Sequence, residues 1–85
     1  MKPRRVLERI LAGSRNIRFE DARRLAEALG FRLDRVRGSH HIFMHRRPGL
    51  RLNLQPDQHG QMKTYQLRQL LDCMEEHGLT LQDHA

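Results

Sequence analysis

The fold of this chain is built around one stretch of sequence, Gly38-Ser39-His40-His41-Ile42-Phe43-Met44-His45, which holds three of the six histidines. Its apolar, β-favouring centre predicts a strand, in which successive side chains point to opposite faces of a sheet. His40, Ile42 and Met44 then share one face, and His41, Phe43 and His45 share the other. Whichever face packs on the core, at least one imidazole remains on the open face.

Arginines flank this strand in the sequence, at Arg35, Arg37, Arg46 and Arg47. Histidine can give or take a proton near neutral pH, and the planar guanidinium of arginine suits phosphate oxygens. The stretch and its surroundings therefore indicate acid–base chemistry on a phosphate chain.

Two further strands and three helices are predicted around it. Residues 31–36 and 50–54 alternate apolar and polar side chains, and turns at residues 37–38 and 46–49 join them to the central strand. Three consecutive strands with short links favour an antiparallel meander with helices over one face, an α+β two-layer fold. A chain of 85 residues has room for only one such domain.

The helices are predicted from apolar residues at 3.6-residue spacing. The first begins near Pro3 and ends before Gly13, the second runs from Phe19 to Leu29, and the third spans about Thr64 to His77 with Thr64 as its N-cap. Leu79 and Leu81 are expected to pack back on the core. The expected buried stripes are Val6, Leu7, Ile10 and Leu11, then Ala22, Leu25, Ala26 and Leu29, and finally Leu67, Leu70, Leu71 and Met74.

The chain is strongly basic, and its charge is uneven. Its 16 lysines and arginines outnumber its 10 acidic residues, for a net charge of +6. Residues 1–51 hold 14 of the bases and 5 of the acids, whereas residues 52–85 hold 2 bases and 5 acids. Because 14 of the 16 bases are arginines, this bias indicates a nucleic-acid partner more than general solubility.

The single cysteine, Cys73, cannot form an internal disulfide, which is typical of a reducing compartment. Its place in a helical pattern favours a small core residue over a nucleophile. No apolar run approaches the ~20 residues needed to cross a bilayer. We therefore expect a cytoplasmic protein without membrane attachment.

Gly38-Ser39-His40-His41 with Phe43, followed by Pro48-Gly49 and a leucine-alternating strand, resembles the HicA family of toxins from toxin–antitoxin pairs. The resemblance covers residues 19–81 as a core and leaves residues 1–18 as an N-terminal helical extension. It implies a double-stranded-RNA-binding-like α-β-β-β-α fold and cleavage of mRNA without a metal or other cofactor. It also implies neutralisation by a HicB-like antitoxin, and we expect the free toxin to be a monomer.

The resemblance places the essential histidine of the family at His40, with His41 as second choice because some members carry it one position later. For RNA contacts we select Ser39 and four basic residues: Arg37, Arg46, Arg47 and Lys63. Lys63 matches a basic position before the final helix of the family. The sequence departs from the family at Arg46-Arg47-Pro48-Gly49, where many members read His-Pro-Asp-Gly.

Other interpretations remain open. One is an RNA-binding module of the same fold that does not cleave, and another is an inactive toxin that only binds an antitoxin-like protein. A metal site at His40, His41 and His45 is disfavoured, because strand neighbours face opposite ways and His41 and His45 would lie ~13 Å apart. The remaining histidines are expected in a loop, at a helix end and in the tail: His59, His77 and His84.

Overall fold

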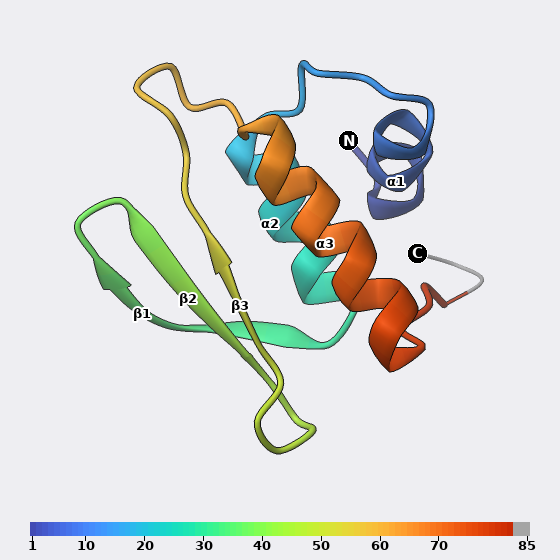
Figure 1. Ribbon diagram of the computed structural model, residues 1–85, viewed down its shortest axis with the longest axis vertical. Helices are drawn as coiled ribbons and strands as arrows, with labels where there is room; N and C mark the ends of the chain where they lie inside the picture. The colour runs from blue at the N-terminus through green and yellow to red at the C-terminus, as the bar shows by residue number, and fades with distance from the viewer. Residues whose placement is uncertain (83–85) are drawn as a thin grey trace.

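The computed structural model describes residues 1–82 and confirms the predicted order of two helices, three strands and a final helix (Figure 1). His84 lies outside the described residues. No helix in residues 1–82 is long and apolar enough to span a membrane. The elements are α1 (Pro3–Leu11), α2 (Phe19–Ala28), β1 (Phe31–Arg37), β2 (His40–His45), β3 (Arg51–Leu54) and α3 (Thr64–His77).

The strands form one antiparallel sheet in the order β1-β2-β3, so the histidine-rich strand is central. Arg37 pairs with His40 at one end of the β1–β2 hairpin, and Phe31 pairs with His45 at the other. On its other side β2 pairs with β3, where His41 lies opposite Leu54. Directly paired residues point to the same face of a sheet, so this register assigns a face to every strand side chain.

A bulge at Asp34 interrupts the pairing between Leu33 and Arg35. An extra residue in one strand shifts its alternation by one position. Phe31 can therefore point into the core at the start of β1, while Arg35 and Arg37 point to the opposite face later in the same strand. A strictly alternating strand would place Phe31 and Arg37 on the same face.

Helices α2 and α3 cover one face of the sheet and leave the other open (Figure 1). Phe43 and Leu54 are fully buried beneath them, and Leu52 is nearly so. The β1–β2 hairpin projects past the helices (Figure 1), so Leu33 and Val36 on edge strand β1 remain 44% and 48% exposed. The predicted two-layer α+β fold is confirmed.

Helix α1 packs on α2 as part of the same hydrophobic core. Val6 is fully buried and Ile10 nearly so, as the apolar stripe predicted. Arg4 donates to the backbone carbonyl of Gln82 over 2.7 Å. The N-terminal segment thus contributes to the core and contacts the opposite end of the described chain.

Three details of the predicted helices differ. Leu11 is 66% exposed because it ends α1 at the edge of a groove. Leu71 and Met74 are only partly buried on α3. Thr64 is not the N-cap of α3: Lys63 takes that position, without a side-chain hydrogen bond, and Thr64 is the first helical residue. Leu79 is buried and Leu81 packs against the core, as predicted.

Candidate active site

His40 is the one histidine of β2 that lies on the open face of the sheet. Phe43 is fully buried, so His41 and His45, two residues away on either side, share its helix-facing side. His40 points the other way, is exposed, and lies across from Arg37 at the end of the β1–β2 hairpin. The structure therefore places the family-implied histidine beside one predicted arginine and within reach of solvent.

Asn53 on β3 contacts His40, with 3.2 Å between Asn53 Nδ2 and His40 Nδ1. Asn53 pairs with Ile42, which makes it the diagonal neighbour of His40 on the open face. A carboxamide has both a donor and an acceptor, so by turning it can bind Nδ1 with or without a proton. This contact holds the imidazole by Nδ1 and leaves Nε2 for another molecule. The sequence reasoning missed Asn53, because only the β2–β3 register brings it to His40.

His41 has a different environment, half-buried on the helix-facing side of the sheet. Its ring lies 4.5 Å from the ring of Phe19, centroid to centroid. Nδ1 donates to the Ser39 carbonyl oxygen over 3.0 Å, since a carbonyl can only accept. A hydrogen bond from Arg23 lowers the pKa of the nearby Glu20 carboxyl, and His41 adds a smaller lowering. His41 thus packs between the hairpin and the start of α2.

His45 is a structural residue at the far end of β2. Its Nδ1 accepts the backbone N–H of Arg47 over 3.1 Å, so Nε2 carries the proton and donates to the Leu29 carbonyl over 3.0 Å. The ring also meets Phe31 edge-on at 5.0 Å. Through these two hydrogen bonds the imidazole links the end of α2 to the β2–β3 turn. Each of the three histidines therefore has its own surroundings, and their rings do not converge.

The predicted RNA contacts divide between the two ends of the sheet. Arg37 and Ser39 lie at the His40 end. Lys63 lies at that end too, because β3 ends opposite His41 and the following loop returns to the start of α3 through a Pro56–Met62 bridge. Arg46 and Arg47 follow His45 at the opposite end of β2. The Arg47 guanidinium donates to the His77 carbonyl at the end of α3.

Three further arginines share the open face with His40, and the sequence reasoning did not select them as RNA contacts. The register places Arg32 and Arg35 on β1 and Arg51 on β3 across from the open-face residues of β2. Residues 31–54 contain six arginines and one acidic residue, whereas α2 and α3 each contain more acidic than basic residues. The positive charge of the molecule thus lies on the sheet with its turns and on residues 1–18, which hold six basic residues and one acidic residue. Strand alternation alone hides the position of Arg35, because the bulge at Asp34 changes the face of the residues that follow it in β1.

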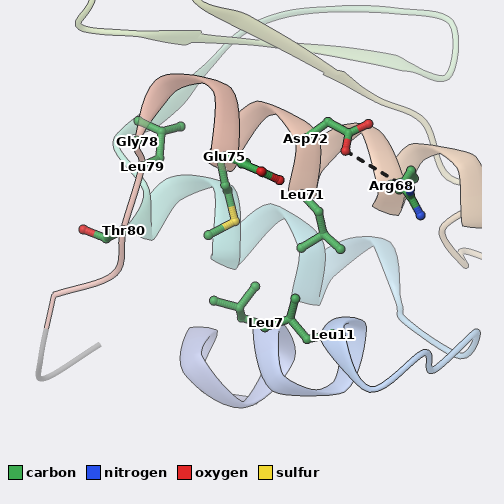
Figure 2. Close-up of a pocket in the computed structure, with 10 residues that line it drawn as sticks. Leu7, Leu11, Arg68, Leu71, Asp72, Glu75, Gly78, Leu79 and Thr80 are labelled. Carbon is green, nitrogen blue, oxygen red and sulfur yellow. Dashed lines mark ion pairs between the residues drawn. The ribbon is translucent and has the colours of Figure 1, made fainter.

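A groove of about 540 Å³ lies between α1 and α3, on the side of the helices away from the sheet (Figure 2). Leu7 and Leu11 line it from α1, and Leu71 lines it from α3. Arg68 and Asp72 line the groove from α3 and form an ion pair of 3.6 Å with each other. None of its lining residues is a histidine, so it lacks a group that titrates near neutral pH. The exposed imidazole of His40 therefore lies on the sheet and not in this groove.

Together these features define a small basic α+β domain with a histidine held on an arginine-rich sheet. A family model described as the HicA toxin of bacterial toxin–antitoxin systems matches residues 19–79, which is most of the chain. The chain therefore belongs to the HicA toxin family, and the resemblance seen in the sequence is confirmed. Comparisons with curated proteins and with solved structures returned no match.

Membership fixes the general role and the fold. The chain is a toxin of a toxin–antitoxin pair, which implies a partner antitoxin. Helix α2, the sheet and α3 form the α-β-β-β-α arrangement expected of a double-stranded-RNA-binding-like domain. Helix α1 lies outside the matched residues.

Proposed function

We propose that this toxin is an endoribonuclease that cleaves mRNA in the cytoplasm without a metal, with His40 as its general acid/base. The observation that carries the proposal is the position of His40: exposed on the open face, opposite Arg37, and held at Nδ1 by Asn53. A histidine positioned in this way typically contributes ~10² to 10⁴-fold to a reaction that involves proton transfer.

The reaction is a transesterification at phosphorus. Nε2 of His40 takes the proton of a ribose 2′-OH, and the 2′-oxygen attacks the adjacent phosphorus. The bond from phosphorus to the 5′-oxygen then breaks, and the leaving oxygen takes a proton from His40 or from water. The products are a 2′,3′-cyclic phosphate and a 5′-OH end. Arg37 is placed to stabilise the charge that develops on the phosphate oxygens.

His40 is favoured over His41 by the surroundings of the two rings. His41 packs against Phe19 and donates Nδ1–H to Ser39, so its ring helps to fix the hairpin on α2. His40 makes its described side-chain contact with Asn53 only and faces the arginines. One histidine must serve both proton transfers or leave one to water, so we expect slow turnover.

The partner we propose is a HicB-like antitoxin that covers the toxin, which is a monomer when free. For RNA contacts at the cleavage point we propose Arg37, Ser39 and Lys63, which lie at the His40 end of the sheet. Arg46 and Arg47 are proposed as weaker contacts, because they lie beyond the other end of β2 and Arg47 is already bound to the end of α3.

The test is cleavage of a defined single-stranded RNA by the purified protein in EDTA. We expect the wild type to cut and to leave a cyclic phosphate, His40→Ala to be inactive while still binding RNA, and His41→Ala to retain cleavage once its folded fraction is accounted for. If His41→Ala is inactive while fully folded and His40→Ala cuts, the assignment is wrong. If the wild type binds RNA and leaves it whole, the chain is a binding module instead.

A further inference from the structure

The open face of the sheet carries an apolar strip with arginines on both sides, three on β1 and one on β3. We call it the arginine face and define it by Arg32, Arg35, Arg37 and Arg51 around Ile42 and Met44. In the register, Arg32 and Arg51 flank Met44 in one row, Arg35 and Asn53 flank Ile42 in the next, and Arg37 lies beside His40 in the last. All four arginines are exposed, and Ile42 and Met44 are half-buried.

The arginines of this face are largely free of intramolecular ion pairs. Arg35 lies 3.4 Å from Asp34, but both side chains are about half exposed, and such surface pairs contribute little. In the part of the chain from Met1 to Gln82, Arg32, Arg37 and Arg51 form no ion pair. The face therefore offers its positive charge to another molecule, and a polyanion is the complementary partner.

We propose that the arginine face is a track for single-stranded RNA, which lies along β2 from His40 toward Met44; the proposal rests on the function proposed above. Arg35 and Arg37 are two residues apart on their strand, or roughly 7 Å, which is comparable to the distance between successive phosphates of an extended chain. The arginines of β1 and β3 contact the backbone, and the bases lie over Ile42 and Met44.

The dimensions favour a single strand over a duplex. From β1 to β3 the face is about 10 Å wide, because neighbouring strands lie ~4.8 Å apart. A protein contacts a duplex across successive grooves, and the base faces of a duplex are stacked inside it. The apolar strip would therefore have no base face to contact. The aromatic rings of β1 and β2, Phe31 and Phe43, are buried on the opposite side. Without a stacking ring on this face, we expect weak base preference.

His40 lies at one end of the track, and this has a consequence for the substrate. Nucleotides on one side of the cleaved bond lie on the arginine face, whereas those on the other side pass the hairpin turn at Gly38. Extending a dinucleotide substrate on the track side should raise kcat/KM, and extending it on the other side should have a much smaller effect. Binding energy from Arg32, Arg35 and Arg51, which do not touch the reacting atoms, thus selects long RNA.

The first experiment measures binding in the full chain with His40→Ala, so that the RNA stays intact. The probe is a fluorescent single-stranded RNA of about 12 nucleotides. The variant combines Arg32→Ala, Arg35→Ala and Arg51→Ala, and the matched control combines Arg5→Ala, Arg15→Ala and Arg68→Ala, which remove the same charge from exposed positions off the sheet. We expect the first set to weaken binding by tenfold or more and to lower the salt slope by about 2, and the control to change affinity by about twofold.

Each of the other outcomes contradicts a named part of the proposal. If the control set weakens binding as much as the first, only net charge matters and the track is wrong. If a duplex of the same sequence binds as tightly as the single strand, the substrate class is wrong. If the first set binds RNA normally but no longer binds the antitoxin, the face binds protein instead. Failure of the proposed function appears separately, as wild-type protein that binds this RNA and does not cut it.

Discussion

Gly30 is the position where we expect a single methyl group to have the largest effect on stability. It joins α2 to β1 with a φ of +104°, and a Cβ built there would lie 2.6 Å from His45 Nε2. That nitrogen donates to the Leu29 carbonyl, so the imidazole has no free space to move without losing the bond. Gly30→Ala therefore combines backbone strain with displacement of His45.

The expected magnitude follows from these two parts. A side chain at positive φ costs about 1 to 2 kcal/mol. Moving the imidazole removes a hydrogen bond worth about 1 kcal/mol and an edge-on contact with Phe31 of about 0.5 to 1.5 kcal/mol. Together Gly30→Ala should lower the free energy of unfolding by about 2.5 to 4.5 kcal/mol, a large part of the 5 to 15 kcal/mol typical of a domain.

Urea denaturation followed by circular dichroism measures this loss, with two controls. Gly13→Ala has a similar φ of +87° but open space around its Cβ, so it should lose only about 1 to 2 kcal/mol. In a His45→Ala background, Gly30→Ala should lose the same smaller amount, because the clash is gone. If Gly30→Ala is no worse than Gly13→Ala, or if its loss is unchanged without His45, the reasoning is refuted.

Three further predictions concern other parts of the chain. Burial raises the pKa of the Cys73 thiol. At about pH 8 this thiol should therefore react with a thiol reagent more slowly than a free cysteine, whose pKa is near 8.5, and it should reach the full rate only in urea. Fast reaction of the folded protein would contradict this. Backbone N–H groups of Gln61 and His59 lower the pKa of the Asp57 carboxyl, so its contribution to stability is present above the ordinary value of about 4 and is lost as the pH falls below it. Asp57→Asn should therefore destabilise the protein near neutral pH and have a smaller effect at about pH 2, as measured by urea titrations at both pH values. Asn53→Ala should lower kcat by about tenfold with little change in KM, because it releases His40 Nδ1. A change in KM alone would mean that Asn53 binds RNA instead.

Much of the fold could be predicted because it depends on local patterns. The third helix begins and ends where its apolar spacing and Gly78 indicated. The three strands follow from alternation and short turns, since neighbouring strands with such links can only pair antiparallel. The Thr64 cap was wrong because the geometry of the loop before α3 gives the N-cap position to Lys63.

The site was harder to predict, because its residues meet across strands. Reasoning along the chain selected Arg46 and Arg47, which follow the histidines in sequence but lie beyond the far end of β2. It missed Arg51 and Asn53, which reach the open face only through the β2–β3 register. The spacing of Leu33 and Val36 did contain a signal: two apolar residues three apart cannot share one face of a regular strand, which indicates a bulge between them.

The sequence by itself determined that His40 and His41 face opposite ways, that the chain is basic with arginine as its main base, and that it resembles the HicA toxins. Alternation, composition and motifs can all be read from the sequence without knowing which segments meet. Only the tertiary structure decided which histidine is exposed and which arginines surround it. The helices bury the face that carries Phe43, and the bulge at Asp34 turns Arg35 and Arg37 outward. Both depend on contacts between segments far apart in the chain, and no local pattern contains them.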